Sequence, residues 1–600
     1  MDSINHEALP AGRVLARLAG FLRPFAAWVL LSVLFSAATT AAGIGLLGTS
    51  AYVIATAALH PSIAVLQVAI VGVRFFGILR GLLRYGERLV SHEVNFRLLA
   101  RLRGWFYQAL EPLSPARLFD QRGGDLLSRV VGDIEALENF YVRAVAPPLA
   151  ALLVTVGMGL FTGQYGAQLS AVLMGGLLLG GLGVPLLSYR LGRRPAQEWI
   201  AARAGLQTVL VDSIQGLADL LAYGQAAHSQ EKMQVFSRRA AGAQLRAAWV
   251  SGLSSALGQL CANLTLLAVL VVAIPLVSAG SLDGVSLAVV SLLTLASFEA
   301  VLPLPQAAQQ MQSSIAAGRR LFALADCAPE VTDPVDPLPA PRGAGISIRE
   351  LTFRYAPDLP PALADLSLEL PVGRRVALVG ASGAGKTTLS NLLLRFWDAP
   401  PGAIFFDGAD IRCYRAADVR ARVAGVAQST YLFTATLAQN LRLARSDASE
   451  AEMRSALRAV GLDNWLDQLP DGLDTWLGEG GARMSGGERQ RLAAARAVLQ
   501  EDAALVILDE PTAHLDAASA ARLMDGLESA LAGKSWLLIT HQLDGALERM
   551  DEILVLDGGR VVERGTHTGL LERGGLYSAM HHLQRGQFDE GGTKGEGQAS

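Results

Sequence analysis

Long apolar runs alternate with charged segments over the first half of the chain. No charged side chain occurs between Arg23 and His60, a longer stretch than the ~20 residues that a helix needs to cross a bilayer. Further apolar runs cover residues 62–83, 144–188, 250–277 and 285–304, and the second of these is long enough for two helices separated at TGQYG, residues 162–166. The pattern predicts six transmembrane helices within residues 21–320.

The segments between these helices differ in charge. The loops near residues 48–61, 162–168 and 277–284 contain no Lys or Arg, whereas residues 84–143 and 190–246 are rich in Arg. By the positive-inside rule, the long segments and both termini are predicted to be cytoplasmic, in a cytoplasmic membrane. Residues 123–133 and 211–221 lie near the middle of these segments. They are candidates either for tips that dock on another domain or for ordinary corners between helices.

The N-terminal segment, residues 1–20, precedes the first apolar run. Apolar residues at helical spacing (Val14, Leu15, Leu18 and Phe21) alternate with Arg13, Arg17 and Arg23. This pattern favours a short amphipathic helix that lies on the membrane surface. A frayed tail is the alternative.

The pattern changes after residue 320. Residues 321–345 are rich in proline without apolar periodicity, which is typical of a semi-rigid linker. From residue 346 to 585, short β-rich runs alternate with helical ones, so we expect an α/β domain with a largely parallel sheet. Residues 586–600 are rich in Gly, Gln and charge, a composition typical of a disordered tail.

Composition agrees with a membrane half joined to a soluble half. Of the 600 residues 51% are hydrophobic and only 18% charged, and the formal net charge is -3, so nothing favours nucleic acid as a partner. Cys261, Cys327 and Cys413 lie far apart in the sequence. A disulfide framework or a zinc site is therefore disfavoured.

The strongest chemical signal is VALVGASGAGKTTL, in which an apolar strand leads through a glycine-rich loop into a helix. The glycines let backbone N–H groups converge on phosphate oxygens, and the start of the helix adds its dipole. Lys386 is expected to reach the β- and γ-phosphates, and the Thr387 hydroxyl to hold Mg²⁺. The predicted nucleotide-binding residues are Gly380, Ala381, Ser382, Gly383, Ala384, Gly385, Lys386, Thr387 and Thr388.

A second signal is ALVILDEPT, residues 504–512. Here an apolar strand ends in Asp509 and Glu510. We expect Asp509 to hold Mg²⁺ through water. Glu510 is placed to orient or deprotonate the water that attacks the γ-phosphate.

A third signal is RMSGGERQR, residues 483–491. Ser485, Gly486 and Gly487 open a helix and so form a second anion-binding helix N-terminus. One domain does not need two phosphate cradles. This one is therefore predicted to cap the nucleotide of a partner domain.

With these motifs the soluble half resembles the ATPase of ATP-binding cassette (ABC) transporters, and the whole chain resembles an exporter half-transporter. The resemblance implies that Tyr355 stacks on adenine, that Gln428 is the Q-loop residue beside Mg²⁺, and that Asp516 belongs to the D-loop. His541 is similarly expected to contact the γ-phosphate, and residues 475–481 resemble the X-loop. Catalytic roles are thereby implied for Lys386, Glu510 and His541. The signature reads MSGGE where LSGGQ is usual.

Charged residues also occur within the predicted spans, where they are costly and usually face a cavity. Arg74, Arg80 and Glu299 are such residues. A basic stripe with a spacing of four residues contains Arg80, Arg84, Arg88 and His92. This stripe suits an anionic substrate, unless Glu87 and Glu93 neutralise it. His92 is either a surface histidine or an axial haem ligand. In the second case the arginines of the stripe would pair with the haem propionates.

Residues 72–118, 124–143 and 297–311 also resemble the CydC-type subunits of thiol-reductant exporters. That resemblance implies a CydD-type half-transporter as partner, export of cysteine and glutathione, support for assembly of cytochrome bd oxidase, and an association with haem. Two alternatives stay open. One is a homodimeric lipid or multidrug exporter, and the other is a haem-binding or haem-transporting protein.

Overall fold

The computed structural model describes residues 9–118, 129–343, 345–428, 430–513, 515–543 and 545–592. It divides the chain into two compact units. The first comprises Met1–Leu113 and Leu118–Ala328, and the second comprises Ser114–Arg117 and Pro329–Ser600. The domain limits drawn from the sequence stay predictions.

The first unit is helical throughout its described residues. Its α-helices are α1 (Ala11–Leu22), α2 (Ala26–Ala57), α3 (Ile63–Leu110), α5 (Ile134–Asn139), α6 (Ala146–Gly163), α7 (Ala167–Leu178), α8 (Val184–Gln215), α9 (Leu217–Ala222), α10 (Ala226–Ser278), α11 (Gly284–Ser297) and α12 (Leu304–Ala325). Six helical segments in the described part of the chain are long and apolar enough to cross a membrane. The predicted six-span fold is confirmed, including the turn between α6 and α7.

The sixth span differs from its prediction as one continuous helix. α11 ends at Ser297, the 3₁₀ turn η6 covers Phe298–Ala300, and α12 begins only at Leu304. Pro303 and Pro305 explain the break, because proline has no N–H to donate and its ring clashes with the preceding turn of a helix. The break places Glu299 in an irregular turn between two helices.

The N-terminal amphipathic helix forms as α1, but its apolar face packs on protein. Val14 and Leu18 are fully or almost fully buried, in a cluster that contains Leu98 of α3 and Phe322 of α12. Arg17 also donates to Asp326 at 2.9 Å. The surface that the sequence assigned to lipid is therefore covered within this chain. Residues 1–8 of the predicted segment lie outside the described residues, as do residues 593–600 of the predicted tail.

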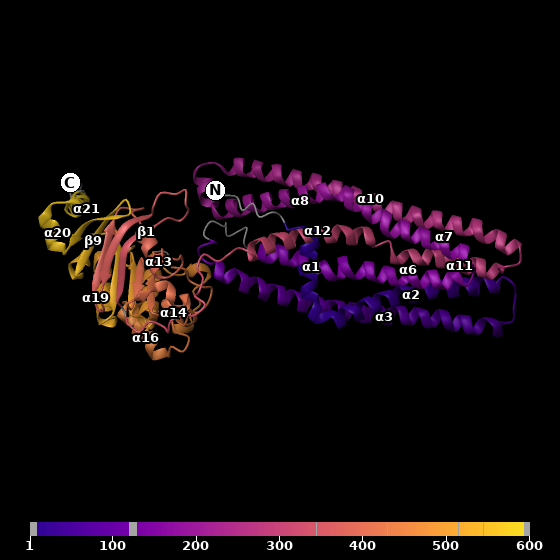
Figure 1. The fold of residues 1–600 in the computed structure, drawn as a ribbon, viewed down its shortest axis with the longest axis horizontal. Coiled ribbons are helices and arrows are strands. Elements are labelled where there is room, and N and C mark those ends of the chain that lie inside the picture. The colour runs from indigo at the N-terminus through magenta and orange to yellow at the C-terminus, as the bar shows by residue number, and fades with distance from the viewer. Residues whose placement is uncertain are drawn as a thin grey trace, which may run out of the picture. The chain divides into compact units, whose positions relative to one another are not determined.

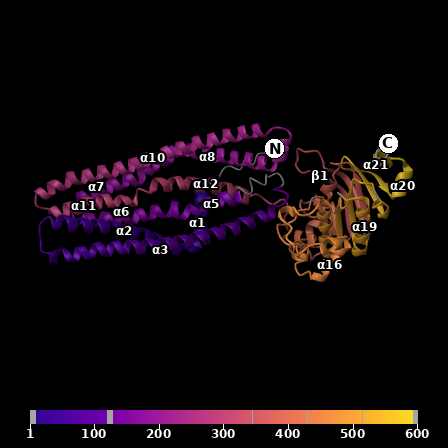
Figure 2. The ribbon, with the colours of Figure 1, turned by 180° about the vertical axis from the view of Figure 1, so that it is seen from behind.

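Two long helical extensions of the first unit form a hairpin. α8 and α10 lie side by side over much of their length (Figures 1 and 2). The short helix α9 joins them between Gly216 and Gly224, and Gly224 adopts φ +67°, which favours glycine. A corner between helices thus lies at the predicted residues 211–221, and its docking on another domain stays a prediction. Of the other predicted tip, residues 123–128 lie outside the described residues.

The second unit is α/β, as predicted. Its strands are β1 (Ile346–Phe353), β2 (Leu363–Leu370), β3 (Arg375–Gly380), β4 (Ile404–Phe406), β5 (Ala409–Asp410), β6 (Val423–Val426), β7 (Leu505–Asp509), β8 (Ser535–Thr540), β9 (Glu552–Asp557) and β10 (Arg560–Gly565). Its α-helices are α13 (Lys386–Leu393), α14 (Ala416–Ala421), α15 (Leu437–Leu441), α16 (Glu450–Ala459), α17 (Asp463–Asp467), α18 (Gly486–Leu499), α19 (Ala517–Ala530), α20 (His567–Arg573) and α21 (Leu576–Gly592).

Two sheets build this unit. The larger has the strand order β10-β9-β3-β8-β7-β6 and is parallel except for the edge strand β10, which is antiparallel to β9. The smaller is antiparallel, with the order β2-β1-β4-β5. The central strands β3, β8 and β7 are neighbours, so their carboxyl ends meet at one edge of the sheet. Ligands of open α/β sheets bind at that edge.

Candidate functional site

The glycine-rich loop follows β3 and precedes α13. Gly380, Gly383 and Gly385 have φ values of +159°, +82° and +103°, which are unfavourable for residues with a side chain. A Cβ on Gly385 would lie 2.4 Å from the carbonyl oxygen of Ala362, and one on Gly380 would lie 2.3 Å from that of Leu556. Glycine is therefore required at both positions. The loop has the tight backbone curvature that a phosphate cradle needs.

Lys386 begins α13 and is buried. Its Nζ donates to the carbonyl oxygens of Gly380 at 2.8 Å and Ala381 at 2.9 Å. Burial lowers the pKa of Lys386, although the nearby Glu510 and Asp509 carboxylates oppose that shift. The ammonium group is thus held at the mouth of the loop, where phosphate oxygens can replace the two carbonyls as its partners.

Two of the three predicted Mg²⁺ ligands, Thr387 and Asp509, come together. The Thr387 hydroxyl lies 3.5 Å from Oδ2 of Asp509, which is the last residue of β7. The pKa of Asp509 is raised to about 6, chiefly by burial and then by the Glu510 carboxylate, and Lys386 and the Thr387 hydroxyl oppose both effects. A buried carboxylate beside a hydroxyl is an oxygen donor set of the kind that Mg²⁺ prefers. The residues present therefore fit a Mg²⁺ ion.

Glu510 lies at the centre of the polar group. It adopts φ +52°, a left-handed conformation that is costly for a residue with a side chain and is found mainly at functional sites. Its carboxylate accepts from Gln428 Nε2 at 2.9 Å and from His541 Nδ1 at 2.5 Å. Because a carboxylate only accepts, Nδ1 of His541 carries the proton. Three predicted site residues from separate segments are thus brought together.

Gln490 is a further neighbour that the sequence analysis did not single out. Its Nε2 donates to the main-chain carbonyl oxygen of Glu510 at 3.1 Å, and its side chain is buried. It lies on α18, five residues after Ser485, and links the helix of the signature segment to the loop that follows β7. Its place within RMSGGERQR was the available signal, but the spacing alone does not tell which polar residue of the helix faces inwards.

Tyr355 lies beside the same loop. Its hydroxyl donates to the Thr388 hydroxyl at 3.1 Å, and its ring meets Trp397 edge-on at 5.3 Å between centroids. The ring is partly exposed. It is therefore fixed at one edge and free to contact a planar ligand, so its role in adenine stacking stays a prediction.

The signature segment opens α18 as predicted. Ser485 is the N-cap, and it forms a capping box with Glu488: the Ser485 hydroxyl accepts from the Glu488 N–H at 3.2 Å, and the Glu488 carboxylate accepts from the Ser485 N–H at 2.8 Å. The glutamate in MSGGE thus stabilises the helix end. Asp516 similarly caps α19 by accepting from the Ser519 N–H at 2.9 Å, and these hydrogen bonds lower the pKa of Asp516.

In the first unit, three of the predicted substrate residues come together. Arg80 of α3 forms an ion pair with Glu299 in η6, and Arg84 lies 4.0 Å from the same carboxylate. The acid that pairs with Arg80 therefore comes from the sixth span, while Glu87 acts electrostatically on Arg84, Arg88 and His92. Glu93, which the sequence offered as a neutralising acid, pairs with Arg97 instead at 2.7 Å.

Arg74, Arg88 and His92 are exposed and do not join this group. Each step of four residues turns the helix by ~40° beyond a full turn, so the stripe rotates away from Glu299 along α3. The ring of His92 stacks on Phe96 at 6.2 Å between centroids. The proposed haem role of His92 and the cavity role of Arg74 stay predictions.

Gly43 of α2 is the residue of this group that the sequence did not reveal. A Cβ on Gly43 would lie 3.1 Å from Cζ of Arg80 and 3.2 Å from Oε2 of Glu299. The backbone of α2 thus closes one side of the ion pair. A single glycine in an apolar run gives no signal of this contact.

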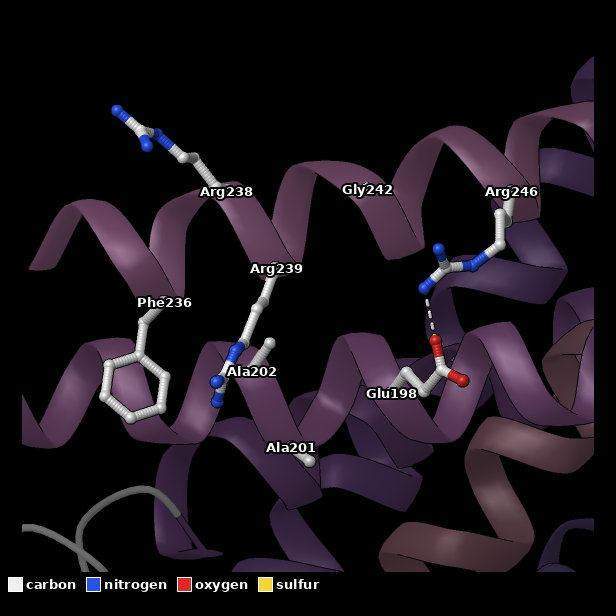
Figure 3. Close-up of a pocket in the computed structure, with 8 residues that line it drawn as sticks. All are labelled: Glu198, Ala201, Ala202, Phe236, Arg238, Arg239, Gly242 and Arg246. Carbon is white, nitrogen blue, oxygen red and sulfur yellow. Dashed lines mark hydrogen bonds and ion pairs between the residues drawn. The ribbon is translucent and has the colours of Figure 1, made fainter. Parts of the chain in front are cut away.

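A separate charged pocket of about 480 Å³ lies between α8 and α10 (Figure 3). Arg239 and Phe236 point from α10 towards α8, and Arg238 points away. At one end Arg246 pairs with Glu198 across the two helices. The pocket contains no acid–base pair suited to chemistry, and its ion pair links the two helices of the hairpin.

Two family models match this chain. The ABC transporter family model matches residues 363–513, and the ABC transporter transmembrane region model matches residues 10–302. A solved structure described as a bacterial Atm1-family ABC exporter with ATP bound has a TM-score of 0.84 and 25% identity, over 94% of this chain and 98% of that chain.

Curated relatives span nearly the whole chain. The glutathione/L-cysteine transport system ATP-binding/permease protein CydC of Escherichia coli is 35% identical over 92% of this chain and 96% of its own length. The CydC protein of Haemophilus influenzae is 32% identical over 90% and 91%. The ATP-dependent lipid A-core flippase of Chromobacterium violaceum is 34% identical over 86% and 87%.

Proposed function

This chain belongs to the ABC transporter family, as an exporter half-transporter that hydrolyses ATP, and on that premise we propose that it exports thiols of the cysteine and glutathione type. It acts as one half of a heterodimer with a CydD-type half-transporter. The proposed setting is the cytoplasmic membrane, with both termini and the ATPase in the cytoplasm. Export of these thiols would support assembly of cytochrome bd oxidase.

The observation that carries the cargo proposal is the charged group of Arg80, Arg84 and Glu299. Two guanidiniums share the Glu299 carboxylate, and Glu87 also acts electrostatically on Arg84, so the group presents charges of both signs. Ionisable groups within membrane helices are costly and mark substrate pathways. Cysteine and glutathione both carry carboxylates, which pair well with guanidinium groups. The names of the CydC relatives support the same cargo.

The proposed ATPase chemistry uses the polar group at the edge of the larger sheet. Lys386 binds the β- and γ-phosphates, and Thr387, Asp509 and Gln428 hold Mg²⁺, which neutralises charge on the phosphates when bound. Glu510 orients and deprotonates the attacking water. His541, whose Nδ1 proton is held by Glu510, contacts the γ-phosphate.

The proposed cycle couples this chemistry to transport. The helix end at Ser485, Gly486 and Gly487 caps the nucleotide of the partner, and Asp516 lines the same interface. ATP then favours the closed pair of ATPase domains, because the γ-phosphate has more partners there than in the open pair. Closure turns the membrane cavity outward, and hydrolysis resets it.

Uptake into inside-out vesicles tests this proposal. Vesicles with this chain and a CydD-type partner should accumulate labelled cysteine or glutathione with ATP, and vesicles with either chain alone should not. The Glu510→Gln variant of this chain provides the blank, because it retains every charged residue of the membrane unit. Equal accumulation without the partner would disprove the heterodimer. An absence of accumulation by vesicles that hydrolyse ATP would disprove the cargo.

Lipid export is a second candidate, because the flippase relative is nearly as similar as the CydC relatives. An apolar cavity of about 550 Å³ is lined by α6, α7, α8, α12 and the turns beside them, with Leu149, Leu152 and Leu182 on its wall. Such a cavity suits an acyl chain. ATPase stimulation by a lipopolysaccharide precursor, without stimulation by cysteine, would favour this candidate over thiol export.

A further inference from the structure

The Arg80–Glu299 group lies within the membrane part of the first unit. Arg80 is 17 residues beyond Ile63, the first residue of α3, and Glu299 is 15 residues beyond Gly284, the first residue of α11. At 1.5 Å per residue these positions are ~26 Å and ~23 Å along their segments. Both fall within the ~30 Å that a hydrocarbon core spans. The charges are thus at membrane depth, towards the cytoplasmic side in the proposed orientation.

A purely structural ion pair in that setting would be neutral and closed. This group is not closed, because the side chains of Arg80, Glu299 and Arg84 are 28%, 41% and 52% exposed, and Arg84 adds a second guanidinium beside the pair. The backbone at Gly43 covers only one side of the pair. The group therefore combines two guanidiniums and one carboxylate on a surface that a small molecule can reach.

We infer that this group recognises the α-amino-carboxylate head of the cargo, which means an ammonium and a carboxylate on one carbon. Cysteine has this head, and so does the γ-glutamyl end of glutathione. The guanidiniums of Arg80 and Arg84 bind the carboxylate, and Glu299 binds the ammonium. The inference rests on the proposed thiol export, and it assigns the selectivity of this site to the head rather than to the thiol.

The exchange of partners makes this recognition favourable. In the chain alone, Arg80 and Glu299 satisfy each other. When a zwitterionic head inserts between them, each regains a partner of opposite charge. A ligand with only the carboxylate would leave Glu299 unpaired, and one with only the ammonium would leave the arginines unpaired. A charge without a partner is costly within a membrane span.

Competition against labelled cysteine uptake tests the inference in the wild-type transporter with its partner. S-methylcysteine keeps the head and lacks the thiol, N-acetylcysteine lacks the ammonium, and cysteamine lacks the carboxylate. We expect S-methylcysteine to compete at least about tenfold better than the other two, since one lost charge pair is worth more than the ~1.4 kcal/mol of a tenfold change. Equal or better competition by N-acetylcysteine or cysteamine would overturn the inference.

A specificity change in one variant separates recognition from a structural role. Glu299→Gln keeps the side-chain shape and removes the partner of the ammonium, so the ratio of cysteine uptake to N-acetylcysteine uptake should fall about tenfold or more. Loss of a merely structural contact would lower both uptakes equally and leave the ratio unchanged, which would contradict the inference. Glu93→Gln is the control. It removes a carboxylate of α3 that pairs with Arg97 on that same helix, so it should leave the ratio of the two uptakes at its wild-type value.

Failure of this inference is distinct from failure of the proposed function. Wild-type vesicles that accumulate neither cysteine nor glutathione would disprove thiol export and the inference with it. Wild-type vesicles that accumulate both thiols, yet do not distinguish S-methylcysteine from N-acetylcysteine, would disprove only the recognition of the head.

Discussion

The two charged groups of this chain are assembled by different means. At the ATP site, Lys386 follows β3, Glu510 follows β7 and His541 follows β8. These strands are neighbours in one parallel sheet, so their carboxyl ends bring the three side chains to one edge. In the membrane unit, Arg80 and Glu299 meet only because α3 and the turn η6 pack with one particular rotation.

This contrast shows which contacts a sequence motif can specify. The place of a motif at the end of a parallel strand is fixed, because sheet topology determines where that end lies. The direction in which a charged side chain points from a long apolar helix is not fixed in this way, since a rotation of the helix by one residue changes that direction by ~100°. The ATP site should accordingly tolerate few changes, and the membrane group should be sensitive to packing.

The largest effect is expected at Glu510. Replacement by Gln removes the base but keeps an acceptor for Gln428 or His541, so ATP should still bind while ATPase activity falls by about 10²- to 10⁴-fold. Steady-state phosphate release and nucleotide binding, measured on the assembled transporter, check both parts. Glu501→Gln serves as the control, because Glu501 pairs with Arg445 on the surface of the same unit. Normal turnover in Glu510→Gln would remove Glu510 from the catalytic role.

The second effect is a pH dependence at Asp509, whose pKa burial raises to about 6. Mg²⁺ needs the carboxylate in its charged form, so the affinity for Mg²⁺ with ATP should fall about tenfold between pH 7 and pH 5 as Asp509 becomes protonated. Asp509→Asn should bind weakly at both pH values. If the affinity of the wild type for Mg²⁺ did not change over this pH range, once titration of the nucleotide itself is subtracted, the shifted pKa would be contradicted.

The same shift has an opposite consequence for the nucleotide-free protein. Because the pKa of Asp509 is raised on folding, the folded state binds more protons than the unfolded state between pH 3.8 and about 6. Its contribution to stability is therefore greatest below that range and is lost as the pH rises through about 6. Asp509→Asn should raise the unfolding temperature at pH 8 more than at pH 5. An equal gain at both pH values would contradict this linkage.

Only part of the fold and of the ATP site can be predicted from the sequence. The six spans, the α/β ATPase and the positions of Lys386, Asp509 and Glu510 follow from apolar periodicity and from motifs tied to strand ends. The burial that raises the pKa of Asp509 does not follow, because it depends on the side chains that surround the end of β7. Gln490 is a similar case, since its motif is visible but its contact with Glu510 needs the packing of α18.

The membrane unit shows the larger gap. The sequence identifies Arg80, Arg84 and Glu299 as unusual charges, and it offers Glu87 and Glu93, which are close along the chain, as acids that could neutralise the stripe. The structure adds an ion pair between Arg80 and an acid 219 residues away. No local feature of the sequence indicates such a distant partner. The break in the sixth span, which positions Glu299, was encoded in Pro303 and Pro305 but was not inferred from them.

The fourth prediction concerns Gly43, which links the apolar helix α2 to the charged group. Gly43→Ala would place a methyl group 3.1–3.2 Å from both charged side chains, closer than ordinary contact, so the ion pair must shift. Overpacking of this kind costs about 1–3 kcal/mol, and we expect cysteine uptake to fall about three- to thirtyfold. Gly81→Ala is the matched control on α3, because a Cβ there meets nothing within 4 Å. Equal effects of the two variants would show that the helix, rather than the ion pair, responds to the methyl group.

The smallest effect is expected at the ion pair between Glu198 and Arg246 on the hairpin of α8 and α10. It has the same chemistry as Arg80 with Glu299, yet its side chains are 55% and 57% exposed, and exposed pairs contribute only ~0–1 kcal/mol. Glu198→Gln should therefore shift the unfolding temperature only slightly, and ~1 M salt should erase the shift, because charges are then screened within ~3 Å. A loss well above ~1 kcal/mol that persists in high salt would mean that a partner chain buries this pair. In that case the exposure seen in one chain would not describe the assembled transporter, and the contrast between the two ion pairs would have to be drawn again with both chains present.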